Sequence, residues 1–348
     1  MTPPITFYIP PVLWPDALPT QPNKDWAGYR LGLYAWTVQT YLWLNAAGVG
    51  CQLASQLPEI GIVLCHSNAL RSVDIEPLPQ RLLVCIKAEA ALSAIAPLHV
   101  VQNPLDISLL GNRYYVPHWP QPQLIARDAS RGDRFETVAF FGHEDNLATE
   151  LKSYAWQVAL AERGLNGRVV ANHNQWNQHS YLETGWNDYH DVDAIIAVRS
   201  FNPIRRLLTG GFAYKPATKL YNTWLAGAIP ILGIESAYRG TGRRGEDYVE
   251  VKSFSDLLER LDQLKADSLW RRSLMAEGKV RSLEFTPEKI VRKSEVFLEA
   301  VAIPAYVEWC KYSARQRQQA LLAAKVRSFL DRGKRKGRRL LLNLLPGA

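Results

Sequence analysis

The sequence predicts an α/β protein with two Rossmann-like domains that face a cleft, followed by a basic helical C-terminal tail. Short apolar runs alternate with helical stretches in two successive units of similar size, which is the pattern of parallel sheets covered by helices. A proline-rich segment separates these units. The charge is also uneven: residues 325–348 hold eight Lys or Arg and one Asp, hence +7 of the net +8 of this 348-residue chain. We therefore expect domains at 1–120 and 121–303 and a tail at 304–348.

Apolar runs bounded by turn residues predict the strands of the first domain. These runs are Ile5–Ile9, Ile60–Cys65, Arg81–Ile86 and Leu98–Val101, and strands buried on both faces of a parallel sheet are apolar throughout. A helical segment is expected between the first two runs, from Trp26 to Ala47.

One stretch of the first domain bears on membrane insertion. Leu31 to Pro58 contains no charged residue, although polar side chains interrupt it. A membrane-spanning helix needs ~20 predominantly apolar residues. We therefore expect a largely buried helix that ends at Gly48, with a membrane span as the alternative.

The cysteines and the N-terminus indicate the compartment. None of the four cysteines is spaced as in C-x-x-C, and Cys65 and Cys85 lie within apolar runs, so buried thiols in a reducing compartment are expected. Residues 1–4 show no signal-peptide pattern. The sequence therefore predicts a cytoplasmic protein.

A proline-rich segment, 115–135, separates the domains, because three prolines in Tyr115–Pro122 oppose both helix and central strand. The α/β pattern then restarts. Strands are expected at Thr137–Phe141, Val169–Ala171, Ala194–Val198, Ile229–Leu232 and Tyr248–Val251. Helices are expected at Leu147–Arg163, at Ala217–Ala226, and from Ser255, as its N-cap, to Leu264.

A pair of lysines carries the sharpest functional signal. Pro216 suits the first turn of a helix that Gly227 ends, which would place Lys215 and Lys219 as i,i+4 neighbours in that turn. Two cations repel there, and each opposes the helix dipole by ~0.3–1 kcal/mol. A bound anion reverses both effects, because free backbone N–H groups and two ammonium groups would face it. The alternative is a pair of solvated surface lysines.

Two further positions follow strands of the second domain. Arg199 comes directly after Ala194–Val198, at the carboxyl edge of the sheet, where it could clamp a diphosphate. The alternative is an ion pair with Asp191 or Asp193. Gly142 and His143 open a strand–turn–helix junction, where a glycine permits close approach of a ligand to the backbone. A plain turn is equally compatible with these residues.

This half of the chain resembles a known family. Asp193 to Leu232, continued by Gly233–Arg239 and Asp247–Val251, resembles the donor-binding half of bacterial glycosyltransferases with the two-Rossmann (GT-B) fold. Those enzymes often carry a Lys-Pro-x-x-Lys-Leu helix, here Lys215 to Leu220, followed by Ala-Gly and a strand. The helix also looks like the Thr-Glu-Lys helix of nucleotide-sugar fucosyltransferases, where the lysine meets the donor diphosphate.

The resemblance implies roles for residues of the helix. Lys219 would contact the donor diphosphate, with Arg199, Lys215 and the neighbouring Leu220 in the same donor site. Asn222 and Tyr214 occupy the two positions at which better-known retaining families place a pair of glutamates. Because both carboxylates are absent, the retaining mechanism does not carry over. Glu235 could instead bind ribose or sugar hydroxyls, with a purely structural role at a helix start as the alternative.

The catalytic base is less well marked. An inverting transferase needs a carboxylate or histidine near the acceptor hydroxyl. His66 and Glu89 follow strands of the first domain, and Asp16 and Asp25 lie in the loop after its first strand. All four are candidates. The spacing of the three later histidines, His173, His179 and His190, is not that of metal ligands, so we predict no bound metal and no other cofactor.

The basic tail allows two interpretations. Its basic residues followed by leucines, within 325–348, could lie on an anionic membrane surface, at the inner face of the membrane. Otherwise it is a solvated terminus. A nucleic-acid partner is not expected, because the rest of the chain carries only +1.

Together these features predict a glycosyltransferase that moves a sugar from a nucleotide-diphosphate donor to a carbohydrate or lipid-linked acceptor, in cell-surface polysaccharide or glycoconjugate synthesis. A hexosyl- or deoxyhexosyltransferase would fit. Two alternatives remain: a nucleotide-sugar epimerase on the same fold, and a non-catalytic nucleotide-binding scaffold.

Overall fold

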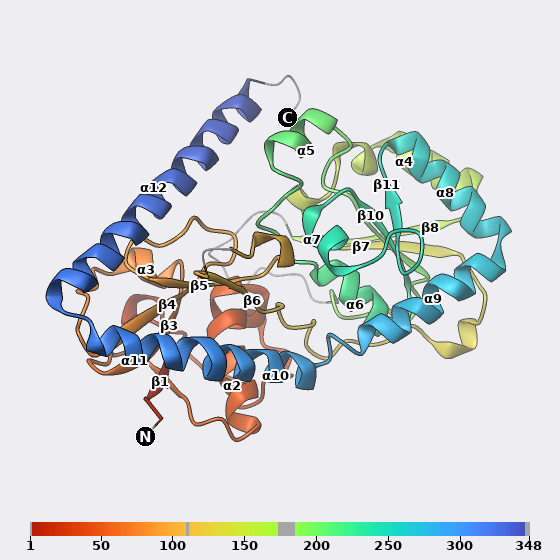
Figure 1. The fold of residues 1–348 in the computed structure, drawn as a ribbon. Coiled ribbons are helices and arrows are strands. Elements are labelled where there is room, and N and C mark those ends of the chain that lie inside the picture. Colours follow the sequence, from red (N-terminus) through yellow and green to blue (C-terminus); the bar gives the residue numbers. More distant parts are fainter. Residues whose placement is uncertain (1, 109–110, 173–184, 345–348) are drawn as a thin grey trace. The chain divides into compact units, whose positions relative to one another are not determined.

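The computed structural model describes residues 2–108, 111–172 and 185–344 and divides into two compact units. The first unit comprises residues 1–119, 214–216 and 287–348, and the second comprises 120–213 and 217–286. Each unit holds one parallel sheet with helices (Figure 1). The predicted α/β class with two Rossmann-like units is confirmed. That the units face a cleft stays a prediction.

The first unit has a six-stranded sheet in the order β2-β1-β3-β4-β5-β6, with every pair parallel. Every residue of the four central strands is buried, as their mostly apolar runs predict. The two edge strands were not predicted, because each has three residues that are only partly buried or exposed. The strands are β1 (Ile5–Tyr8), β2 (Gln52–Ala54), β3 (Gly61–His66), β4 (Arg81–Ile86), β5 (Leu98–Val101) and β6 (Arg113–Tyr115).

The predicted helix of the first unit begins later than expected. A 3₁₀ turn, η2 (Ala27–Arg30), is followed by Leu31 in an extended conformation (φ −99°, ψ 126°), so the continuous helix starts at Gly32. It runs through α1 (Gly32–Tyr34), the π-helical turn η3 (Ala35–Gln39) and α2 (Thr40–Ala46). Its apolar side chains are buried from Leu33 to Val38 and again at Leu44, whereas Leu42 and Trp43 are partly buried, so the helix is largely buried as predicted. In the part of the chain that the structure describes, no helix combines the length and apolarity that a membrane span requires.

The second unit has a five-stranded sheet in the order β11-β10-β9-β7-β8, again with every pair parallel. The strands are β7 (Thr137–His143), β8 (Asn166–Asn172), β9 (Ala194–Ala197), β10 (Ile229–Gly233) and β11 (Val249–Val251). The helices are α4 (Tyr154–Glu162), α5 (Pro203–Leu208), α6 (Thr218–Ala226), α7 (Ser236–Thr241), α8 (Phe254–Ala266) and α9 (Ser268–Ser282). All five predicted strands occur, and β7 and β8 are longer than predicted.

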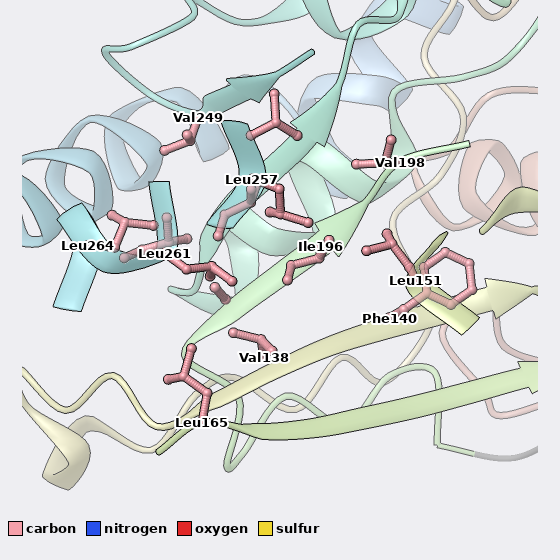
Figure 2. Close-up of a cluster of buried hydrophobic side chains, with 14 of the residues drawn as sticks. Val138, Phe140, Leu151, Leu165, Ile196, Val198, Val249, Leu257, Leu261 and Leu264 are labelled. Carbon is pink, nitrogen blue, oxygen red and sulfur yellow. The ribbon is translucent and has the colours of Figure 1, made fainter. Parts of the chain in front are cut away.

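Helix α8 shows how the second unit builds its core. Leu257, Leu261 and Leu264 are fully buried and pack against Val138 and Ile196 of the sheet (Figure 2). The predicted helix is therefore present, but its predicted N-cap is wrong.

The N-cap of α8 is Ser253 rather than Ser255. The Ser253 hydroxyl accepts a hydrogen bond from the Asp256 N–H at 3.1 Å, while Ser255 lies inside the first turn. Both serines precede the buried leucines of α8, so sequence spacing alone did not show which serine is the N-cap.

The C-terminal helices belong to the first unit. They are α10 (Pro287–Phe297), α11 (Ile303–Lys311) and α12 (Ala314–Asn343), with the short α3 (Ala69–Ser72) earlier in the same unit. Residues 287–303, which we assigned to the second domain, therefore pack with the first sheet, where Ile290 is fully buried. The residues beyond 304 are not a separate tail either, because Trp309 Nε1 donates to the Leu78 carbonyl at 3.0 Å.

Asp247 gives the second unit a pH-dependent stability. Its side chain is buried and accepts two bonds from the Arg243 N–H, at 2.9 and 3.0 Å, with Arg281 at 3.6 Å. Burial outweighs these contacts and raises the pKa of Asp247 to about 6. The folded state therefore binds the proton more tightly than the unfolded state, so this contribution is present at acidic pH and is lost as the pH rises through about 6.

We expect the free energy of unfolding to fall by about 2–3 kcal/mol between about pH 4 and pH 7 on account of Asp247. Asp247→Asn should remove this part of the dependence. Chemical denaturation at several pH values tests it through the difference between wild type and variant. Parallel pH profiles for the two proteins would contradict the prediction.

Candidate functional site

The carboxyl edge of the second sheet gathers most of the predicted donor-site residues. Gly142 and His143 end β7, Arg199 follows β9 by two residues, and Glu235 follows β10 by two residues. Because all strands are parallel, these ends meet at one edge of the sheet, where ligands of such sheets bind. Helix α6 starts at the same edge, since Lys219 in its first turn reaches the Phe141 carbonyl.

Lys219 and Gly142 are brought together as predicted. The Lys219 ammonium donates to the Phe141 carbonyl and lies 4.6 Å from the centroid of the Phe140 ring. Gly142 has φ +147°, and a Cβ at this position would clash with Lys219 Nζ. The N-cap residue of α6 is Ala217, which has no side-chain oxygen to cap the helix. The arrangement sets a cation beside an uncapped helix N-terminus, which suits an anion.

Lys215 does not lie in the first turn of α6. Helix α6 begins at Thr218, and Ala217 is non-helical (φ −88°, ψ 24°), so Lys215 and Pro216 precede the helix. The predicted i,i+4 pairing in one turn is therefore wrong. Lys215 instead forms an ion pair with Glu89 in the first unit, so it is not a solvated surface lysine either.

Arg199 and Glu235 form a buried ion pair. Their Nε and Oε2 atoms are 3.0 Å apart, and the side chains are only 9% and 1% exposed. Arg199 also donates to Asn146 Oδ1. The alternative partners, Asp191 and Asp193, are bound by other arginines of the unit, Asp191 by Arg168 and Asp193 by Arg127 and Arg131. The burial of this carboxylate and its bond to Arg199 favour a role for Glu235 in positioning Arg199, and a contact with ribose stays a prediction.

Three other predicted site residues make structural contacts within the second unit. Leu220 is fully buried in the core and has no exposed side-chain surface for a ligand. Asn222 Oδ1 accepts from the Gln121 N–H at 3.2 Å and so fixes the linker segment to α6. The His143 ring packs edge-to-face on Trp186, with centroids 5.1 Å apart. These contacts are structural, and a donor-binding role for Asn222 and His143 stays a prediction.

Tyr214 lies in the first unit, among charged side chains that the sequence did not bring together. Lys87 Nζ is 4.3 Å and the Arg335 guanidinium 3.4 Å from the centroid of its ring. Lys87 is fully buried and pairs with Asp106 at 2.5 Å. Burial lowers the pKa of Lys87, and the Asp106 carboxylate opposes this effect. Lys87 was not among the predicted residues. Because it directly follows β4, its position after a buried strand is the sequence signal that could have identified it.

The candidates for the catalytic base differ in environment. Asp16 is exposed, and Glu89 is engaged by Lys215. Asp25 pairs with Arg30 at 3.0 Å. His66 is buried at the end of β3, and its Nδ1 accepts a hydrogen bond from the Asn68 N–H at 3.2 Å.

The bond to Nδ1 decides what His66 can do. A ring nitrogen that accepts an N–H carries no proton, so in the neutral ring the proton sits on Nε2. No partner for Nε2 occurs among the described residues, and it faces Gly32, where a Cβ would lie 3.7 Å from it. Burial, with Arg71 and His118 adding to it, lowers the pKa of His66 to about 3. In this geometry His66 is a hydrogen-bond donor rather than a base.

We expect His66 to stay neutral, with its proton on Nε2, between about pH 5 and pH 8, since burial disfavours the charged ring. Two-dimensional ¹⁵N–¹H spectra of the imidazole rings measure both the charge and the tautomer. The urea-unfolded chain is the control, where the same ring should titrate near ~6.5. A charged His66 ring in the folded protein at about pH 6 would contradict this assignment.

Across the part of the chain that the structure describes, no three His, Cys, Asp or Glu side chains gather as metal ligands would. His173 and His179 lie outside the described residues. The expectation that no metal or cofactor is bound stays a prediction.

Comparison with known proteins supports the fold. No protein-family model matches the chain, and no curated protein matches its sequence. HepE of Anabaena, solved with UDP-glucose, is similar with a TM-score of 0.52 and 11% identity, over 86% of this chain and 100% of that chain. Sucrose-phosphate synthase of Thermosynechococcus elongatus is similar with a TM-score of 0.50 and 12% sequence identity, over 86% of this chain and 99% of that chain. The chain therefore has the GT-B fold of glycosyltransferases, as predicted. Similarity to fucosyltransferases stays a prediction.

Proposed function

We propose that the chain is a glycosyltransferase that moves a sugar from a nucleoside-diphosphate donor to a carbohydrate or lipid-linked acceptor. The observation that carries the proposal is the junction of β7 with α6. There the Lys219 ammonium, the close-approach position Gly142 and an uncapped helix N-terminus converge at the carboxyl edge of the sheet.

The chemistry of this junction suits a diphosphate. An ammonium group next to free backbone dipoles stabilises negative charge on a phosphate and on a diphosphate leaving group. The Arg199–Glu235 pair lies at the same edge, where Glu235 holds the Arg199 guanidinium in a fixed position. UDP-sugars are the first donors to test, because HepE of the same fold was solved with UDP-glucose.

Thermal-shift measurements with uridine, guanosine, thymidine and cytidine diphosphates test the proposal. Stabilisation grows with ligand concentration over the dissociation constant, so the correct base should raise the melting temperature most. The sugar donor with that base is then incubated with and without candidate acceptors. Release of nucleoside diphosphate that needs an acceptor supports transfer, whereas conversion of the free donor alone indicates an epimerase. No stabilisation by any of the four would overturn the proposal.

A further inference from the structure

Helix α12 has one face bound to the first unit. Ser328 Oγ donates to the Leu92 carbonyl at 2.7 Å, and Asp331 accepts from the Leu92 N–H at 3.0 Å. One turn further, Arg335 donates to the Glu89 carbonyl at 2.7 Å. With the buried Ala324, these positions are spaced three or four residues apart and so form a single inner face.

The opposite face of α12 is apolar and exposed. At about 100° per residue, its exposed large apolar side chains fall on the side away from Ala324, Ser328, Asp331 and Arg335. Phe329, for example, is 75% exposed. We define the apolar stripe as Leu322, Val326, Phe329, Leu330, Leu340 and Leu341, all of them exposed. Exposed apolar residues gathered on one face mark an interaction surface.

Basic side chains border the apolar stripe on both sides. By the same helical geometry, one flank holds Lys325, Arg332, Lys336 and Arg339, and the other holds Arg327, Lys334 and Arg338. Within α12 the only acidic residue is Asp331, which lies on the inner face and pairs with Arg335 at 3.2 Å. The outer surface of this helix therefore combines an apolar centre with positive flanks and no negative charge.

This pattern identifies the chemistry of the partner. Long basic side chains extend toward phosphate headgroups while their stems and the apolar side chains enter the acyl boundary. A nucleic acid would be held by the basic flanks but would leave the apolar stripe without a role. We propose that the outer face of α12 lies on the surface of an anionic phospholipid bilayer. This inference does not depend on the proposed donor site.

Co-sedimentation of the full chain with vesicles tests it. Vesicles of phosphatidylcholine are compared with vesicles that also contain phosphatidylglycerol, at low and high salt. Binding should need the anionic lipid and weaken with salt, because salt screens the attraction of each Lys or Arg to the anionic surface.

Two sets of substitutions separate the apolar from the electrostatic contribution to vesicle binding. Phe329→Ser with Leu330→Ser should weaken binding about tenfold or more, by loss of apolar insertion. Lys325→Gln, Arg332→Gln and Lys336→Gln together should weaken it about 100-fold. Leu269→Ser with Val280→Ser on α9 is the matched control, since both side chains are exposed at 70% and 62%, and it should bind like wild type. Circular dichroism verifies that all variants keep their helices.

Three results would overturn the proposal. The first is vesicle binding that the apolar substitutions leave unchanged. The second is tighter binding of a nucleic-acid duplex than of anionic vesicles. The third is a wild-type dimer that Phe329→Ser with Leu330→Ser converts to a monomer in light scattering, because the stripe would then be an interface between two copies.

Discussion

Lys219→Ala should weaken the binding of a nucleoside diphosphate by about 100-fold, which corresponds to about 3 kcal/mol. In the folded chain the ammonium is held at the first turn of α6 by the Phe141 carbonyl and the Phe140 ring. It is therefore already in place for a phosphate, and the variant loses a charge-assisted contact that needs no reorganisation. Isothermal titration with the nucleotide that gives the largest thermal shift measures the effect.

The matched control is Lys265→Ala. Lys265 belongs to the same unit, and its ammonium also donates to a backbone carbonyl, that of Arg163, but far along the chain from the junction of β7 and α6. Its removal should leave the affinity unchanged. If Lys219→Ala binds as tightly as wild type, the site assignment is wrong. If wild type binds no nucleoside diphosphate, the proposed function itself fails.

Gly142→Ala addresses the same site through sterics. A Cβ at position 142 would run into Lys219 Nζ, and φ +147° is strained for alanine. Gly245→Ala is the control for backbone strain, because Gly245 also has a positive φ (+84°) but a Cβ added there would meet no atom within 4 Å. We expect the first variant to lose affinity as Lys219→Ala does, and the second to lose some stability only.

The strands of both sheets could be predicted because their signal is local. Arg81–Ile86 and Leu98–Val101 have the predicted bounds, since each is a mostly apolar run between turn residues. The partners of the C-terminal helices could not be predicted in the same way. The apolar pattern of α10 shows which side is buried, but nothing in the sequence states that the first sheet rather than the second covers Ile290.

The same distinction between local signals and contacts of the folded chain applies to the candidate site. Gly142 and Lys219 meet because the end of a strand and the start of a crossover helix share one edge of a parallel sheet. Spacing alone placed Lys215 in the same helical turn as Lys219. Because Ala217 is not helical, Lys215 lies outside that turn. The partnership of Arg199 with Glu235 joins residues far apart in the sequence, so only the folded chain reveals it.

Glu235→Ala should lower the stability of the second unit by about 3–5 kcal/mol, because it leaves the Arg199 guanidinium buried and without its carboxylate. Replacing both residues by leucine should recover part of this loss, since no uncompensated charge remains. Chemical denaturation of Arg199→Leu, Glu235→Leu and the double leucine variant gives the coupling. Asp133→Ala is the control: it breaks an exposed pair with Arg272 and should change stability by about 1 kcal/mol or less.

Ligand binding by Glu235→Gln then separates the two roles considered for this residue. A ribose ligand at position 235 would make the variant weaker toward the nucleoside diphosphate but leave pyrophosphate binding unchanged, because pyrophosphate has no ribose. A positioning residue acts through Arg199, whose guanidinium faces the phosphates in the proposed site. The burial of Glu235 and its 3.0 Å bond from Arg199 favour the second role. We therefore expect the variant to lose affinity for the nucleoside diphosphate and for pyrophosphate by the same factor. Unchanged pyrophosphate binding would instead indicate that Glu235 binds the ribose.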